Sequence, residues 1–441
     1  MRTALLRSPL DRDILRLAVP ALGALVAEPL FLLTDTALVG HLGADALAGL
    51  GIASIVLQTA VGLLVFLAYA TTPTVARRLG AGDTPGAIRA GIDGMWLALG
   101  IGVLLLVAGL PLAAPVARTL GADGAVADAA TTYLSVSLWG LPGMLLVIAA
   151  TGLLRGLQDT RTPLIVAVAG FAANAGLNAL LIYGAGLGIA GSALGTVVAQ
   201  WGMAAVYVVI AVRAARRYGS PLRPGLRGVS ASALAGGWLL LRTASLRVAM
   251  LATVAVGASV GVTELATLQI ALTVFSTLAF VLDAYAIAGQ ALIGHGLGAA
   301  DVPRVQAVTR RLIVLGVVSG VALGLVAAAL APLLGPVFTS DAAVRQALVP
   351  ALLVVAASTP LAGYVFVLDG VLIGAGDARY LAWTGVVNLV AYLPLLALAA
   401  FASGTAALVA ILAALCFGYL GARAVTLGLR ARGTRWIVTG A

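Results

Sequence analysis

Two carboxylates stand in the first long apolar stretch of the chain, where an ionised group is costly. Glu28 and Asp35 are seven residues apart, about two helical turns, so they share one face of a predicted helix that also contains Pro20 and Pro29. A carboxylate held away from water is protonated more readily than one in solution. The pair therefore predicts a proton relay, against the simpler alternative that Asp35 lies at a helix end and is only solvated.

Charged residues also interrupt the apolar stretches of the second half of the chain. For Asp283 we favour a buried ion pair with Arg242 or Arg247, which would fix helix packing, over a role in transport. For Asp369 two interpretations stay open. It either caps an irregular segment at 370–376 or faces a cleft.

Two amides share a helical face in the first half. Asn174 and Asn178 are four residues apart, and amides within a membrane often bond neighbouring helices. Spacing alone leaves helix packing and a functional role equally open.

The composition indicates that these polar and charged residues lie on membrane-spanning helices. Of 441 residues, 62% are hydrophobic and 10% are charged, which excludes a water-soluble globular protein. All 26 basic residues are arginine and lie mostly in loops, so the net charge of +10 does not indicate a nucleic-acid partner. A single cysteine and two histidines exclude disulfides and Cys- or His-based metal centres. Long apolar runs predict an all-α polytopic membrane protein. Its twelve expected spans are 14–39, 46–76, 91–116, 126–154, 162–184, 188–212, 231–259, 264–293, 306–331, 343–373, 380–401 and 404–429.

Arginines are distributed unequally between the two sides. The loops after odd-numbered spans hold only Arg118 and Arg345, whereas the other loops and the termini hold most of the rest. By the positive-inside rule both termini are cytoplasmic. The first apolar run is too long for a signal peptide and reads as a retained span. The arginine- and alanine-rich composition favours a bacterial cytoplasmic membrane.

The chain also repeats internally. A single gapless shift of the chain against itself, the one that places Gly80 on Gly298, aligns glycines, prolines and charged residues that do not recur by chance in an alanine-rich chain. The same shift also pairs Asp83 with Asp301, Pro85 with Pro303, Pro142 with Pro360, Gly152 with Gly370 and Asp159 with Asp377. We therefore predict two parallel six-helix lobes, 1–212 and 231–441, related by a pseudo-two-fold axis along the membrane normal and joined by a basic cytoplasmic linker, 213–230. This is the arrangement of an alternating-access transporter.

Several of these motifs together resemble a known family. Residues 35–43 (DTALVGHLG), 80–83 (GAGD), 153–160 (LLRGLQDT) and 368–377 (LDGVLIGAGD) are similar to the multidrug and toxic compound extrusion (MATE) transporters. The last of these, with Leu282-Asp283, resembles the DinF-like branch, named for the DNA-damage-inducible bacterial member. The resemblance covers essentially the whole chain.

The resemblance implies export of amphipathic, usually cationic compounds by antiport against protons or sodium. It places the coupling acid at Asp35, the bend of the first helix at Pro20, and the polar network at Asn174, Thr196 and Tyr133. The family's tenth-helix acid matches Asp369. The family's usual second acid falls at Asn178, and 231–259 contains no acid, which weakens the case for sodium.

We therefore expect a proton-coupled efflux antiporter, not an enzyme, that works as a monomer without a cofactor. No metal is required, although the oxygens of Asp35, Asn174, Asn178 and Thr196 would allow weak sodium binding. The alternatives are a sodium-coupled exporter and a lipid-linked precursor flippase, whose pyrophosphate would need Arg242 and Arg247. An intramembrane transferase would need a carboxylate cluster for Mg²⁺, and the sequence has no such motif.

Overall fold

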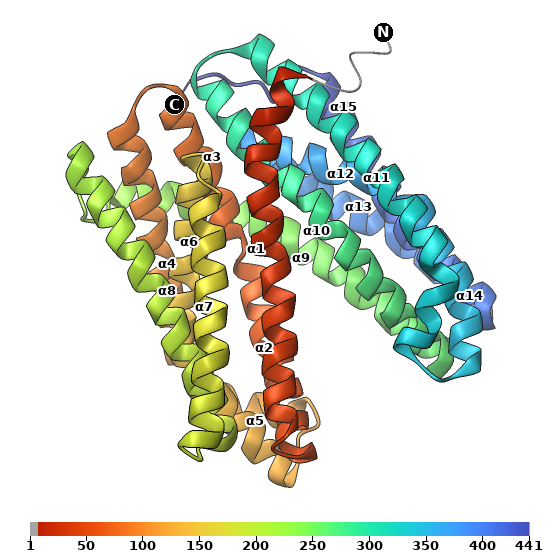
Figure 1. Cartoon of the computed structure of the whole chain (residues 1–441). Coiled ribbons are helices and arrows are strands. Elements are labelled where there is room, and N and C mark those ends of the chain that lie inside the picture. Colours follow the sequence, from red (N-terminus) through yellow and green to blue (C-terminus); the bar gives the residue numbers. More distant parts are fainter. Residues whose placement is uncertain (1–7, 441) are drawn as a thin grey trace. The chain divides into compact units, whose positions relative to one another are not determined.

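The computed structural model describes residues 8–440, and Figure 1 traces their helices in chain order. The ends of the two predicted lobes, 1–7 and 441, lie outside the described residues. Within the described residues, twelve segments are long and apolar enough to cross a membrane, so the predicted number of spans is confirmed. The helices are α1 (Pro9–Gly40), α2 (Ala44–Leu64), α3 (Phe66–Gly80), α4 (Thr84–Thr119), α5 (Gly124–Ser137), η2 (Leu138–Gly140), α6 (Leu141–Gly156), α7 (Arg161–Ala179), η3 (Leu180–Gly184), α8 (Gly188–Tyr218), α9 (Leu226–Val260), α10 (Val262–Gly298), α11 (Val302–Phe338), α12 (Ala342–Gly374), α13 (Ala378–Ala399), α14 (Gly404–Ala413), η4 (Ala414–Tyr419) and α15 (Leu420–Arg432).

Aspartates of the sequence repeat start equivalent helices. The Asp83 side chain accepts a hydrogen bond from the Gly86 backbone N–H (2.8 Å), and Asp301 accepts one from Arg304 (3.1 Å). Each aspartate is the N-cap of its helix, α4 or α11, and a proline follows in the first turn of each. The side-chain oxygen satisfies a backbone donor that the helix leaves free, and proline needs no such partner.

Glycines of the repeat mark close contacts between helices. A Cβ added at Gly152 of α6 would lie 2.9 Å from Cα of Ala68 in α3, and one added at Gly370 of α12 would lie 2.5 Å from Cα of Ala286 in α10. The sequence repeat places Gly152 on Gly370 and Ala68 on Ala286, so the two contacts are equivalent. Gly102 and Gly320 approach Pro142 and Pro360 in the same way. Small residues let membrane helices approach closely, so the duplication extends to packing.

Replacing Gly370 by alanine should therefore destabilise the protein. The new methyl group would meet the backbone of α10, which cannot move aside as a flexible side chain can. We expect a loss of about 1–3 kcal/mol, seen as a lower midpoint of thermal unfolding in detergent. Gly421→Ala is the control because its added Cβ meets nothing within 4 Å. Equal effects of the two substitutions would contradict the packing argument.

The chain forms two compact units whose limits differ from the predicted lobes. One unit is 19–236, and the other joins the residues up to Ala18 to Gly237–Gly440. Of the predicted linker, 213–218 belongs to α8 and 226–230 to α9, so only 219–225 is irregular. This segment packs on α4, where the Ser220 hydroxyl donates to the Pro85 carbonyl (2.7 Å).

Two charged residues at equivalent positions of the repeat bind the starts of α9 and α1. Asp93 of α4 accepts a hydrogen bond from the Gly225 N–H (2.7 Å), just before α9. Arg311 of α11, which the sequence repeat aligns with Asp93, pairs with Asp11 in the first turn of α1 (Nε to Oδ1, 2.5 Å). The unit boundaries in α1 and α9, after Ala18 and after Gly236, also lie at equivalent positions of the repeat. Both lobes thus hold the start of a helix whose remainder belongs to the other unit.

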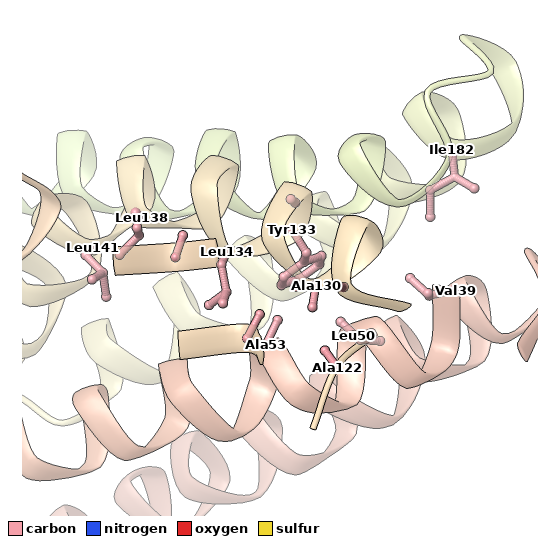
Figure 2. Close-up of a cluster of buried hydrophobic side chains, with 14 residues drawn as sticks. Val39, Leu50, Ala53, Ala122, Ala130, Tyr133, Leu134, Leu138, Leu141 and Ile182 are labelled. Atoms are coloured by element: carbon pink, nitrogen blue, oxygen red, sulfur yellow. The ribbon is translucent and has the colours of Figure 1, made fainter. Parts of the chain in front are cut away.

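An apolar cluster in unit 19–236 positions the polar site described next. Figure 2 shows Tyr133 within a cluster of buried side chains that also contains Val39, Leu50, Leu134 and Leu138. These side chains come from α1, α2, α5 and η2. Tyr133 is 5% exposed, so packing fixes its ring. Its hydroxyl is thereby held in place to donate a hydrogen bond to Asp35.

Candidate functional site

Asp35 is the centre of a buried polar cluster in unit 19–236. Its Oδ1 accepts hydrogen bonds from Ser192 Oγ (2.6 Å) and Asn178 Nδ2 (2.8 Å), and its Oδ2 accepts one from the Tyr133 hydroxyl (3.1 Å). The carboxylate is 5% exposed, and Asn178 and Ser192 are fully buried. Donors from α5, α7 and α8 therefore converge on one carboxylate of α1. The alternative in which Asp35 is only solvated at a helix end is wrong.

A second pair of polar residues lies one helical turn away. Asn174 of α7 donates to Thr196 of α8 (3.0 Å), and both residues are buried. Asn174 and Asn178 are four apart on α7, as Ser192 and Thr196 are on α8, so the two packed helices present matching polar faces. Within residues 8–440 the Oδ1 atoms of both asparagines are buried without a hydrogen-bond partner. The site thus offers two spare amide oxygens.

A small cavity connects this region with Glu28. Glu28, Phe31, Phe171, Asn174 and Thr196 are among its lining residues, and its volume is about 50 Å³. The rings of Phe31 and Phe171 stack with centroids 5.0 Å apart. A cavity of this size holds at least one water molecule, given polar groups to bond it. Glu28 thus shares a space that water can fill with Asn174 and Thr196, whereas Asp35 is not among the residues that line it.

The second charged cluster lies in the other unit and has a different character. Asp369 of α12 is paired with Arg242 of α9 (Nε to Oδ1, 3.1 Å, with a further contact from Nη2 to Oδ2) and with Arg423 of α15 (Nη2 to Oδ1, 3.3 Å). All three side chains are largely buried. The arrangement ties three helices, α9, α12 and α15, together.

The comparisons with known proteins agree with this architecture. The MatE family model matches residues 20–180 and 239–401, more than half of the chain. The chain belongs to the MatE family. Protein DETOXIFICATION 44, chloroplastic, of Arabidopsis thaliana is 30% identical over 391 residues, covering 85% of this chain and 74% of the relative.

Two further comparisons, one with a related sequence and one with a solved structure, agree with this family and its fold. DNA damage-inducible protein F of Escherichia coli is 27% identical over 305 residues, covering 66% of this chain and 64% of that protein. The crystal structure of a mutant of the Vibrio cholerae MATE transporter VcmN has a TM-score of 0.87 at 21% identity, covering 97% of this chain and 98% of that one. The all-α, two-lobe fold is thus shown, and members of this family are transporters, not enzymes.

In this MATE transporter five predicted site residues come together, and others lie elsewhere. Tyr133, Asn174, Asn178 and Thr196 lie around Asp35 or one turn from it. Pro20 lies in α1 two residues beyond the unit boundary at Ala18. The structure thus leaves Pro20 as a candidate hinge within α1, a role that stays a prediction.

The structure corrects two expectations for the second lobe. Residues 370–374 are helical, so Asp369 does not cap an irregular segment there and instead pairs with two arginines. Arg247 is exposed and has no ion-pair partner among residues 8–440, so the pairing of Asp283 with Arg247 is wrong. Asp283 is partly buried in α10, and its pairing with Arg242 stays a prediction.

Two residues of these clusters were missed in the sequence. Ser192 makes the shortest recorded contact with Asp35, and its spacing of four from Thr196 repeats that of Asn174 and Asn178. That spacing was the available signal. Arg423 lies in the last predicted span, where a buried arginine should have been paired with an acid of another span.

Proposed function

We propose that this MATE transporter exports amphipathic, cationic compounds in exchange for protons, with Asp35 as the coupling acid. The observation that carries the proposal is the convergence of three donors, from three different helices, on one buried carboxylate. Such a group changes its local contacts when it gains or loses a proton. It can therefore link a proton to a movement of α1.

The hydrogen bonds define how protonation acts. The ionised carboxylate accepts from Tyr133, Asn178 and Ser192, and each such bond stabilises the charged form, whereas burial opposes it. Protonation turns one carboxylate oxygen into an O–H donor and removes the negative charge. The carboxyl group then accepts hydrogen bonds from Tyr133, Asn178 and Ser192 less strongly than the carboxylate does. The contacts of α1 with α5, α7 and α8 then weaken. Antiport requires only that this change alters the affinity for substrate between the two states.

The same cluster favours protons over sodium. Tyr133, Asn178 and Ser192 all donate hydrogen bonds to Asp35, and the cluster contains no second carboxylate. Sodium needs several oxygen ligands and gains from added negative charge. The spare Oδ1 atoms of Asn174 and Asn178 are the observation that keeps a sodium-coupled exporter as the second candidate.

The second lobe gives less support to a lipid-linked precursor flippase. That function would use Arg242 to bind a pyrophosphate, but Arg242 is held by Asp369 in a largely buried pair. A guanidinium group with a carboxylate partner is a weaker anion site. The tied arrangement of α9, α12 and α15 fits a structural role better.

The ion is tested by driving dye efflux from everted vesicles with an imposed pH gradient or an imposed sodium gradient. We expect efflux to follow the pH gradient and to persist without sodium. Asn178→Asp should increase the effect of sodium, because it restores a second carboxylate beside Asp35. Efflux that needs sodium and ignores the pH gradient would overturn proton coupling. The unchanged parent in the same vesicles is the reference for the variant.

We also propose that the protein lies in a bacterial cytoplasmic membrane with both termini inside, as a monomer. The arginine asymmetry predicts that a reporter inserted near Gly219 is cytoplasmic and one near Gly186 is on the opposite side. Both sites are loop glycines with positive φ, so insertion there disturbs no helix interior. A cytoplasmic signal at Gly186 would contradict the predicted orientation.

A further inference from the structure

A basic cavity lies in unit 19–236, away from the Asp35 cluster. Its volume is about 560 Å³, and it is formed by the end of α3, the start of α4 and the segment that enters α9. Arg78, Arg89 and Arg227 line it together with a single acid, Asp93. The cavity therefore carries an excess of positive charge. Nothing in the proposed proton coupling uses it.

The acid of the cavity already has a partner, whereas two of the arginines do not. Asp93 is buried and accepts a hydrogen bond from the Gly225 N–H at the start of α9 (2.7 Å). Arg78 has only a long, exposed contact with Asp83 (3.7 Å). Among the described residues, the guanidinium groups of Arg89 and Arg227 have neither a hydrogen bond nor an ion pair. Two free guanidinium groups beside one cavity form a phosphate-binding arrangement.

Exposed apolar side chains lie on the elements that form the cavity, and they suit a position at a membrane surface. Leu226 is 86% exposed, and Leu222 and Trp96 are also exposed. The indole N–H of Trp96 donates to the Leu222 carbonyl (2.9 Å), which fixes the segment against α4. Tryptophan is enriched at the level of lipid headgroups, where its ring is amphipathic. A ligand that binds both the arginines and these apolar side chains has an anionic head and an apolar tail.

We propose that this cavity binds the phosphate headgroup of an anionic phospholipid, with the acyl chains along Trp96, Leu222 and Leu226. Arg89 and Arg227 bind the phosphate oxygens, and Arg78 adds positive charge at the rim. The sequence supports the setting, because the loop with Arg78 and Arg89 and the basic 213–230 segment are predicted on the same side of the membrane. Basic pockets between membrane helices on that side are suited to lipid headgroups. The lipid would hold the start of α9 against α4.

The test is native mass spectrometry of the purified full chain in detergent with added lipid. We expect the parent to retain phosphatidylglycerol in preference to the zwitterionic phosphatidylcholine. The double variant Arg89→Gln/Arg227→Gln should bind phosphatidylglycerol at least about tenfold more weakly, since each basic residue near an anionic lipid surface contributes roughly fivefold. Both side chains are exposed, so the variant keeps its fold.

A matched control separates this site from general charge. Arg118→Gln/Arg310→Gln removes the same charge from two exposed arginines that have no side-chain partner among residues 8–440. We expect it to bind phosphatidylglycerol as the parent does. Parental affinity in the Arg89/Arg227 variant, or an equal loss in the control, would overturn the site. Displacement of the lipid by an equal concentration of inorganic phosphate would show that the cavity recognises a soluble anion, which overturns the lipid assignment.

Discussion

Replacing Asp35 by asparagine should reduce gradient-driven dye efflux to the background of vesicles without the protein. The amide is close in size to the carboxyl group and still accepts hydrogen bonds, but it cannot gain and lose a proton. We expect the fold and the binding of substrate to remain, with a stability change below about 2 kcal/mol, because one charged hydrogen-bond acceptor is exchanged for a neutral one. Efflux in everted vesicles and dye binding to the purified protein measure the two effects separately.

A nearby aspartate supplies the control for this substitution. Asp45 lies in the first turn of α2, is exposed and is not part of the cluster. Asp45→Asn should therefore transport at the parental rate. If Asp35→Asn also transports at that rate, the coupling group lies elsewhere, and Asp369 is the next candidate.

The second large effect is expected at Asp369 and is one of stability. Asp369→Asn leaves Arg242 and Arg423 buried without a carboxylate between them. Removing one partner of a buried ion pair costs about 3–5 kcal/mol, because the remaining charge is uncompensated. The variant should give much less folded protein on size-exclusion chromatography in detergent, and a lower midpoint of thermal unfolding.

The control for Asp369 removes a negative charge from an exposed position. Asp128 lies in α5, is exposed and has no side-chain partner among the residues that the structure describes. Asp128→Asn should leave the unfolding midpoint within experimental error. A stable Asp369→Asn protein that fails only in transport would show that Asp369 has a transport role instead of the structural one.

The sequence predicted the parts of the fold that depend on local pattern. Apolar runs long enough to span a membrane predicted twelve spans, because a helix in lipid must satisfy its own backbone. The repeat identified Asp83 and Asp301, which cap equivalent helices, and Gly152 and Gly370, which lie at equivalent close contacts. Such residues are constrained by their immediate surroundings. The same residue types therefore stand at equivalent positions of both halves, where a comparison of the sequence with itself finds them.

The contacts between site residues depend on which helix faces pack together. A local sequence pattern does not contain this information. The spacing of Ser192 from Thr196 indicates a shared polar face, but serine in a helix rich in glycine and alanine often serves only close packing, so the sequence does not identify Asp35 as its partner. Arg423 lies in a predicted span and therefore needs an acidic partner, but the sequence does not show which acid of another span that partner is. The unit boundaries inside α1 and α9 were missed because both helices continue through them without a change of composition.

The central claim is that proton movement through Asp35 is coupled to substrate movement. It is tested most directly by imposing a gradient of a fluorescent cationic dye such as ethidium across proteoliposomes with no initial pH gradient, and following internal pH. The account predicts that the dye gradient drives protons in the opposite direction with the parent protein and that Asp35→Asn gives no proton movement. Dye-driven proton movement in Asp35→Asn equal to that of the parent, or none with a parent protein that transports the dye, would contradict it.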